Sequence, residues 1–577
     1  MRIEPTEFDL VVLGTGLENS LIAGAAAKAG KSVLHVDDGE VYGDDWGSLT
    51  LAELKARLEA PPQSQEAIDL GEEVEGLGVR RLARDSHPYS NVEIHEADGV
   101  DTGPSRDYTI DLAPKVAYCI EPLIEVLLKS GAHQYLDFRL VECSYIWQHG
   151  QLRKVPASRS DVFRDRSLKS SEKRMLTQFL KMVVSKLGDE QEEIASDRPF
   201  VGWLEEQGLS KPLAELVLYA VAMGEQTGTM TTTQGVAALG LYLASMGRYR
   251  DGSGAFMIPY YGSGDLPQAF CRLCAVKGGI YVLRCPLAAC LTEPGSQECR
   301  GVITQEGQHI SCHGLVASQQ WLRSFLADAE NGASQQQCRL SRAVCVTDGS
   351  LREGESQVLV VFPPGSVGGK NDRVIHAIQV GHPVCPKGRF LLYLCCHSTA
   401  ETAKQDLADA VACLLREVPD GQNTPSESCS TIKDTAPQME QSRNARNCID
   451  AKEHEPVEGT TPEATAEGER LEAGCAPEGA DVLVDVRPKA SFVCYYNETV
   501  ELHPPCAALP SNVASCSGPG GLIGYREHVA SAEAGFGKLF PDEEFYPVVM
   551  PTTLQDSDDE ALGDLEATLT TIGAAGD

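Results

Sequence analysis

Positive charge, aromatic side chains and long apolar runs are all scarce in this chain. Its 577 residues carry 49 Lys and Arg against 83 Asp and Glu, a formal net charge of -34, and 6% of them are aromatic. An acidic surface repels phosphate backbones, so we expect no nucleic-acid partner and favour basic protein partners. No uncharged apolar run is long enough to span a bilayer, and no charged-then-apolar segment opens the chain. We therefore expect a cytoplasmic protein that is neither secreted nor membrane-spanning.

A disulfide framework and a metal site are not indicated either, although the chain has 20 cysteines. The expected compartment is reducing, so free thiols are expected. Cys271 and Cys274 have the spacing of half a zinc site, but they lie in a run that is predicted to be helical. No second pair at zinc spacing accompanies them. We interpret the cysteines as buried structural residues and expect no metal.

The strongest fold signal is a strand, turn, helix and strand unit near the start of the chain. Its four parts lie at Phe8–Leu13, Gly14 to Gly16, Leu17–Ala29 and Ser32–Val36. Asp37 ends the second strand, about 20 residues after the glycines, which is the spacing of a dinucleotide-binding unit. We therefore predict an α/β fold that begins with a dinucleotide-binding type of sheet.

The dinucleotide fingerprint is damaged where a phosphate would bind. Asn19 replaces the third glycine, which lets the helix pack closely on the strand in intact sites. Glu18 places a carboxylate in the first helical turn, where it would compete with a pyrophosphate for the positive end of the helix. A nucleotide fold used as a scaffold is favoured over a working flavin site, so FAD is not expected.

The remaining pattern predicts one sheet domain that is interrupted by a helical insertion. The expected segments are sheet domain at 1–160, 249–418 and 481–553, helical domain at 161–248, disordered acidic insert at 419–480 and mobile acidic tail at 554–577. Within the sheet domain, helices are predicted at Ala113–Lys129, Asp265–Val276 and Ser531–Leu539, and a strand at Phe138–Trp147. Asp265 is expected to be the N-cap of its helix.

Four stretches, spread over most of the chain that is expected to be ordered, resemble the family of Rab escort proteins and Rab GDP-dissociation inhibitors. They are VVLGTGLENSLIAGAAAKAGKSVLHVDDGEVYG, VPASRSDVFRDRSLKSSEKRMLTQFL, YYGSGDLPQAFCRLCAVKGGIYVL, and the pair LPSNVASCSGPGG and LFPDEEFYP. The third is the most specific. The second and fourth, with the long acidic insert, are closer to escort proteins. Where the family usually shows Tyr-Gly-Gly after the second strand, this chain has Tyr42-Gly43-Asp44.

The resemblance implies a flavoprotein-like sheet domain with no redox activity and no catalytic residue. It implies binding of newly made, GDP-bound Rab GTPases and their presentation to the Rab geranylgeranyltransferase heterodimer. It also implies delivery of the lipidated Rab to membranes, which the escort contacts transiently. The helical domain would receive the geranylgeranyl group and dock the transferase. The Rab-binding platform of the family matches Tyr42, Asp265 and Arg272 in this sequence.

Alternative interpretations remain at this point. The chain could be a Rab GDP-dissociation inhibitor that only recycles prenylated Rab, although the insert at 419–480 favours an escort protein. It could be a FAD-dependent oxidoreductase, against which Glu18 and Asn19 argue. Asp265 could serve only as a helix cap, Tyr42 as a loop anchor, and Arg272 as a solvated surface residue.

Overall fold

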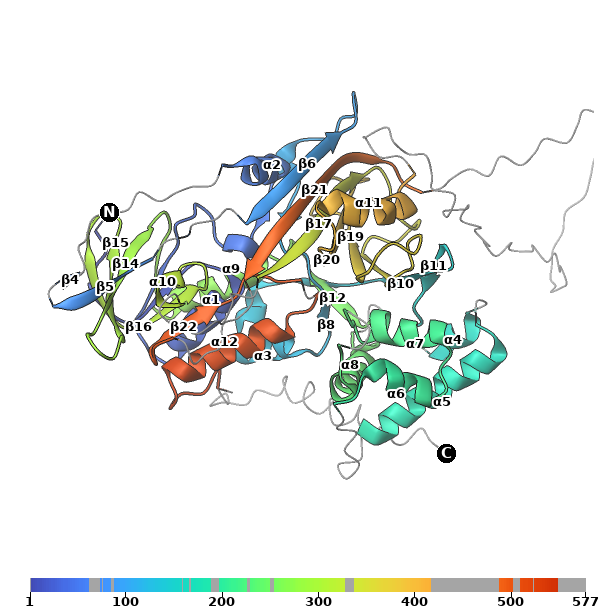
Figure 1. Ribbon diagram of the computed structural model, residues 1–577, viewed down its shortest axis with the longest axis horizontal. Coiled ribbons are helices and arrows are strands. Elements are labelled where there is room, and N and C mark those ends of the chain that lie inside the picture. Colours follow the sequence, from blue (N-terminus) through green and yellow to red (C-terminus); the bar gives the residue numbers. More distant parts are fainter. Residues whose placement is uncertain are drawn as a thin grey trace, which may run out of the picture. The chain divides into compact units, whose positions relative to one another are not determined.

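The computed structural model describes residues 2–61, 73–74, 76–82, 84, 88–157, 159–165, 168–187, 197–225, 229–249, 254–326, 337–416, 487–501, 509–521 and 523–547. All of them belong to one compact unit (Figure 1). The segments at 419–480 and 554–577, for which disorder and mobility are predicted, lie outside the described residues.

The first sheet contains the predicted dinucleotide-type unit. In the described residues it has nine strands, of which β13, β2, β1, β16 and β22 are parallel neighbours. The strand order is β13 (Ile280–Val282), β2 (Val33–Val36), β1 (Glu7–Leu13), β16 (His309–Ser318), β15 (Cys299–Thr304), β14 (Leu287–Thr292), β5 (Leu77–Arg81) and β4 (Glu73–Val74), with β22 (Val513–Cys516) also on β16. Every residue of β2 and five of the seven residues of β1 are buried, as expected for parallel strands with both faces covered.

Helix α1 (Leu17–Lys28) packs between two other helices, α9 (Asp265–Val276) and α12 (Arg526–Leu539). The three share a core with the β1 side chains Leu10 and Val12. The small side chains of α1 permit this close packing. A Cβ atom at Gly24 would lie 2.5 Å from the Tyr546 hydroxyl, so glycine is needed where the C-terminal segment crosses the helix.

The second sheet has eight described strands. Their order is β11 (Gln151–Lys154), β10 (Cys143–Gln148), β18 (Val358–Phe362), β19 (Ile375–Val380), β20 (Phe390–His397), β17 (Gln337–Thr347), β21 (Ala490–Glu501) and β6 (Tyr89–Glu96). Helix α11 (Ala403–Leu414) packs on it and begins with a capping box between Thr402 and Gln405. Two small sheets join β8 (Ala117–Tyr118), β12 (Phe256–Pro259) and β9 (Phe138–Leu140), and β3 (Ser48–Leu49) with β7 (Ile110–Asp111).

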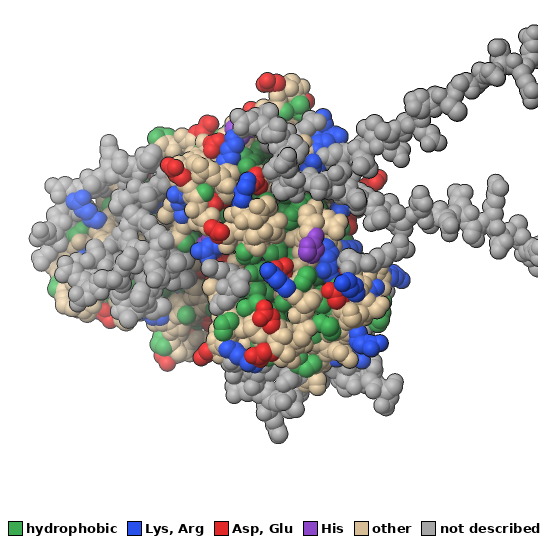
Figure 2. Space-filling model, turned by 45° about the vertical axis from the view of Figure 1, so that its right-hand side comes forward, with side chains coloured by type: hydrophobic (Ala, Val, Ile, Leu, Met, Phe, Trp, Pro, Cys, Tyr) green, Lys and Arg blue, Asp and Glu red, His purple; other side chains and the backbone are tan. Residues whose placement is uncertain are grey.

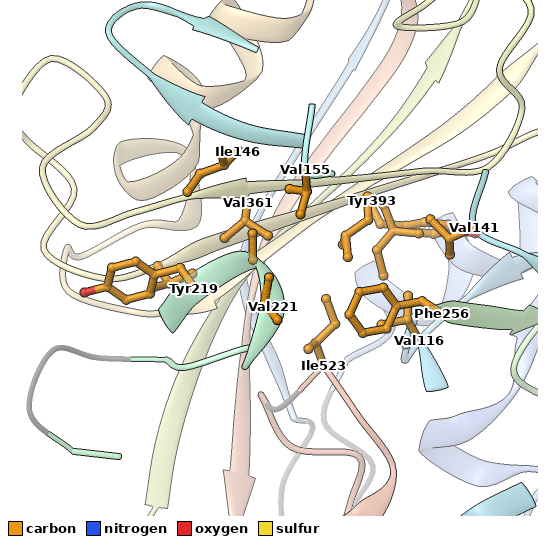
Figure 3. Packing of buried hydrophobic residues seen from close by; sticks show 14 of the residues in the cluster. Val116, Val141, Ile146, Val155, Tyr219, Val221, Phe256, Val361, Tyr393 and Ile523 are labelled. Carbon is orange, nitrogen blue, oxygen red and sulfur yellow. The ribbon is translucent and has the colours of Figure 1, made fainter. Parts of the chain in front are cut away.

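Between β11 and β12 the described chain is helical, and helices α4 to α8 gather together (Figure 1). They are α4 (Arg159–Arg164), α5 (Ser170–Leu187), α6 (Phe200–Glu206), α7 (Lys211–Glu215), the π-helical segment η4 (Leu216–Val221) and α8 (Thr232–Ser245). Tyr219 and Val221 of η4 belong to the same apolar cluster as Val361 and Ile523 (Figure 3). The predicted class, an α/β fold with an inserted helical part, is confirmed.

The remaining short elements are α2 (Leu51–Glu59), α3 (Pro122–Ser130), α10 (Arg323–Leu326), η1 (Asp44–Trp46), η2 (Ser105–Asp107) and η3 (Ala132–Tyr135). The helix predicted at Ala113–Lys129 is wrong over its first half. Residues Ala113 and Val116 to Cys119 are all buried, so their spacing does not mark one face of a helix. The helix begins only where Pro122 takes its first position.

Two further predictions differ from the structure. The strand predicted at Phe138–Trp147 is two strands, β9 and β10, which belong to different sheets. Helix α12 starts at Arg526 rather than Ser531 and continues through Gly535. A Cβ atom at Gly535 would lie 3.1 Å from Ile22 of α1, so this glycine permits the two helices to approach.

Candidate functional site

Tyr42, Asp265 and Arg272, which the resemblance implies for a Rab-binding platform, line one surface cavity of about 350 Å³. Tyr42 lies in the loop after β2, and the other two lie on α9. The other lining residues are Tyr135, Gln268, Ala269, Cys271, Ala275 and Tyr281. The fold therefore brings the three side chains to one place from two distant parts of the chain.

Helix α9 presents the site because its two faces differ. Leu266, Phe270 and Leu273 are buried, whereas Arg272 is exposed. The guanidinium of Arg272 lies 4.6 Å from the ring centre of Tyr135, within the range of a cation–π contact. This contact holds the arginine over the cavity and leaves its N–H groups available to a partner.

The start of α9 corrects one prediction. Asp265 is the first helical residue, and Gly264 takes the N-cap position without a side-chain cap. The start of the helix is held by Asp111 instead, which accepts hydrogen bonds from Ser263 N (2.9 Å) and Ser48 Oγ (2.6 Å). The carboxylate of Asp265 is thereby left to face the cavity, while its position still favours the helix dipole.

Burial affects the charges of the cavity wall. It raises the pKa of Asp265, and the nearby Asp137 carboxylate raises it further. Burial also raises the pKa of Tyr42, so its phenol stays a hydrogen-bond donor at neutral pH. The cavity thus offers a phenol, a guanidinium and a carboxylate to a protein surface of mixed polarity.

Asp111 gives the stability of the protein a testable dependence on pH. Burial raises its pKa from 3.8 to about 6, so the folded state holds the proton more tightly than the unfolded state. The stability that Asp111 contributes is complete below pH 4 and is lost as the pH rises through 6. We expect this carboxyl to lower the free energy of unfolding by about 1 kcal/mol between pH 5 and pH 8.

Denaturant unfolding of wild type and Asp111→Asn at both pH values measures this change. Asparagine mimics the protonated acid, so the variant should lack this part of the pH dependence. Glu121, whose pKa burial raises to about 7, is present in both proteins and cancels in the comparison. An equal pH dependence in the two proteins would contradict the assignment.

The polar groups of the dinucleotide-type turn form hydrogen bonds with other residues of the chain. Asp37 Oδ2 accepts hydrogen bonds from Thr15 N (2.7 Å) and Thr15 Oγ1 (2.5 Å), and Asp37 Oδ1 accepts one from Gly39 N (2.7 Å). Asp37 is buried. The carboxylate that binds a ribose in intact sites therefore accepts its hydrogen bonds from two backbone N–H groups and a hydroxyl of the chain itself.

The space beside this turn is small. The cavity next to Gly16 is only about 20 Å³, and Asn19 and Trp46 help to line it. A Cβ atom at Gly16 would lie 3.3 Å from Trp46 Cδ1, and one at Gly14 would lie 3.8 Å from a carboxylate oxygen of Asp44. A large side chain thus narrows the space beside the turn, and the acid next to it is ion-paired with Arg84 (3.0 Å).

Glu18 has a different role from the one its position suggested. Its fully buried carboxylate accepts hydrogen bonds from Ser517 N (2.9 Å), Ser517 Oγ and Ser531 Oγ (2.9 Å), and His528 Nδ1 lies 2.7 Å away. The side-chain nitrogen of Asn19 donates to Leu13 O (3.0 Å). These two residues fasten α1 to the C-terminal segment and to β1.

Two apolar surfaces lie outside the predicted site. A cavity of about 550 Å³ is lined mainly by apolar side chains of α3, β9 and β12, including Leu127, Leu128, Phe138 and Met257. On α4, Phe163 is 65% exposed while its neighbour Val162 is buried. Exposed aromatic rings are typical anchors of protein interfaces. Neither surface was found from the sequence, because periodicity does not distinguish an exposed apolar residue from a core residue.

The described residues show no large surface of one charge on the face drawn in Figure 2, where Lys and Arg are interspersed with Asp and Glu. Within the same residues, no helix is long and apolar enough to cross a bilayer. No group of three or more His, Cys, Asp or Glu there is arranged to hold a metal ion. Cys271 and Cys274 are free thiols buried in α9.

Comparisons with known proteins agree with the resemblance. Residues 4–75 and 85–455 match the family described as GDP dissociation inhibitor. The chain is 35% identical over 434 residues to Rab escort protein 1 of Arabidopsis thaliana, which covers 68% of this chain and 77% of that protein. It is 26% identical over 671 residues to Rab proteins geranylgeranyltransferase component A 2 of Mus musculus, covering 94% and 97%.

A solved structure supports the fold. The crystal structure of RAB GDI from Plasmodium falciparum superposes with a TM-score of 0.62 at 15% sequence identity, covering 93% of this chain and 99% of that chain. Sequence and fold together give one result: the chain belongs to the GDP dissociation inhibitor family, with Rab escort proteins among its relatives.

Proposed function

We propose that this chain is a Rab escort protein. It binds newly made, GDP-bound Rab GTPases, presents them to the Rab geranylgeranyltransferase heterodimer, and carries the lipidated Rab to membranes. The observation that carries the proposal is that Tyr42, Asp265 and Arg272 line one cavity in a chain of this family. The relatives named as escort proteins or transferase components support the choice over a recycling inhibitor.

A lipidated product requires a host in water. Exposed methylene groups cost roughly 0.8 kcal/mol each, so a geranylgeranyl group must be covered during transfer. We assign this task, and the docking of the transferase, to the helical insertion between β11 and β12. Packed helices can separate to admit an apolar chain and close again, so the lipid is held in the cytoplasm and released at a membrane.

The protein acts without a redox cofactor of its own. Thr15 and Gly39 of the chain itself donate hydrogen bonds to Asp37, and Trp46 lies close to Gly16. We expect purified protein to be colourless and to remain so after incubation with FAD and gel filtration. Flavin absorbance in the protein fractions would favour the oxidoreductase interpretation instead.

Prenylation in vitro tests the function. Purified transferase, geranylgeranyl diphosphate and an unmodified GDP-loaded Rab are incubated with and without the protein, and lipid incorporation is measured. If the protein is an escort protein, lipid is incorporated into Rab only when the protein is present. A Rab without its C-terminal cysteines measures the background incorporation. If incorporation does not depend on the protein, but the protein extracts prenylated Rab from membranes, it is a recycling inhibitor and the proposal is wrong.

A further inference from the structure

The hydroxyl of Thr15 connects the dinucleotide-type turn to the loop that carries Tyr42. Thr15 Oγ1 donates to Asp37 Oδ2 (2.5 Å) and accepts a hydrogen bond from Gly43 N (2.8 Å). Thr15 is fully buried, and the bond to Gly43 is shielded from water. Because Gly43 directly follows Tyr42, this bond fixes the backbone next to the tyrosine.

The ring of Tyr42 is supported by Tyr281 of β13, which is linked to the same turn. It packs edge-on against Tyr281, with 5.9 Å between ring centres. The hydroxyl of Tyr281 lies 3.0 Å from His35 Nδ1, and His35 Nε2 lies 2.6 Å from Gly14 O. The backbone next to Tyr42 therefore contacts Thr15, and its ring is linked through Tyr281 and His35 to Gly14, although neither Gly14 nor Thr15 lines the cavity.

We propose that Thr15 is a positioning residue for partner binding, which acts by holding Tyr42 in place. The turn that binds a pyrophosphate in dinucleotide-binding folds here serves as the rigid base of a protein-binding surface. The inference rests on the proposed function in one respect, since it takes Tyr42 as a contact to Rab. It extends that function to a buried residue that touches no partner.

The substitution that isolates the hydroxyl is Thr15→Val, because valine has nearly the same shape. It leaves the buried N–H of Gly43 without its acceptor and removes one donor from Asp37. Thr15→Ser keeps the hydroxyl and is the matched control. We expect the dissociation constant for a GDP-loaded Rab to rise about tenfold in Thr15→Val and to stay within about twofold of wild type in Thr15→Ser.

Double-mutant cycles separate positioning from general destabilisation. In a Tyr42→Ala background, Thr15→Val should cause little further loss of affinity, because the residue that it positions is gone. In an Arg272→Ala background the two losses should multiply. Equal losses in both backgrounds, or an affinity near wild type for Thr15→Val, would overturn the inference. If Thr15→Val does not fold, Thr15→Ala removes the same hydroxyl with less crowding and replaces it in both cycles.

A measurement without Rab makes the outcome independent of the proposed function. Hydrogen exchange of free Thr15→Val should rise in the backbone segment 39–47 and stay at the wild-type level in α9. Unchanged exchange in 39–47 would contradict the support of the loop by Thr15. If exchange rises but the prenylation assay shows no escort activity, the proposed function fails while the structural support of Tyr42 stands.

Discussion

Arg272→Ala should weaken binding of a GDP-loaded Rab at least tenfold, which corresponds to about 1.4 kcal/mol, and leave the melting temperature nearly unchanged. The side chain is exposed, and its contact with the Tyr135 ring is of a kind that contributes about 0.5–1 kcal/mol at exposed sites. At an interface the same guanidinium can donate forked hydrogen bonds to carboxylates or carbonyls, and arginine is frequent among binding hot spots. Calorimetric titration measures the loss.

The matched control for Arg272 is Lys277→Ala. Lys277 is an exposed cation at the C-terminal end of the same helix, and it does not line the cavity. Its loss removes one positive charge from α9 without touching the proposed platform. Wild-type affinity in folded Arg272→Ala, or an equal loss in Lys277→Ala, would remove Arg272 from the platform and weaken the assignment of Tyr42 and Asp265.

Phe163→Ala should lower the rate of Rab prenylation about tenfold at limiting protein, with Rab binding unchanged. The ring is 65% exposed on the helical insertion, so its loss costs little folding energy. Burying a phenylalanine at an interface contributes about 1.5–3 kcal/mol, which is enough for the expected loss if this ring anchors the transferase. Prenylation rates at several transferase concentrations and a separate Rab titration measure the two effects.

Val100→Ala is the control for Phe163, because Val100 is an exposed apolar residue outside the helical insertion. It should leave prenylation at the wild-type rate. If raising the transferase concentration restores the rate of Phe163→Ala, the defect lies in docking, as expected. A wild-type rate in Phe163→Ala at low transferase concentration would exclude the ring as an anchor.

The sequence predicted those parts of the fold that depend on local pattern. The helix expected at Asp265–Val276 is α9 with the same bounds, because its apolar residues recur at helical spacing and glycines follow it. The strands and helix around Gly14 are correct to within a residue or two. The helix at Ala113–Lys129 failed because a segment buried on all sides carries no periodic signal to separate β8 from α3.

The site was predictable only in part. The resemblance indicated three site residues, Tyr42, Asp265 and Arg272. The local pattern alone predicted only which face of α9 carries Arg272. Of the side chains that contact them, Tyr135 lies outside the quoted stretches, and Tyr281 lies in the third stretch, where nothing in the local pattern indicates its contact with Tyr42. Contacts between residues far apart in the chain leave no trace in a single sequence, so the cavity could not be foreseen from it.

The buried carboxylate of Glu18 has a consequence for synthesis on the ribosome. Its partners are Ser517, His528 and Ser531, and the hydroxyl of Tyr546 donates to Leu21 O (2.8 Å) in the same helix. Helix α1 is among the first elements to emerge, yet these partners of its carboxylate, Ser517, His528 and Ser531, are made only near the end of synthesis. Through most of translation, β1 and α1 must therefore be kept from aggregating, so we expect the nascent chain to bind chaperones. A stop codon shortly before α12 would leave that charge buried without its histidine, so a late truncation should be as damaging as an early one.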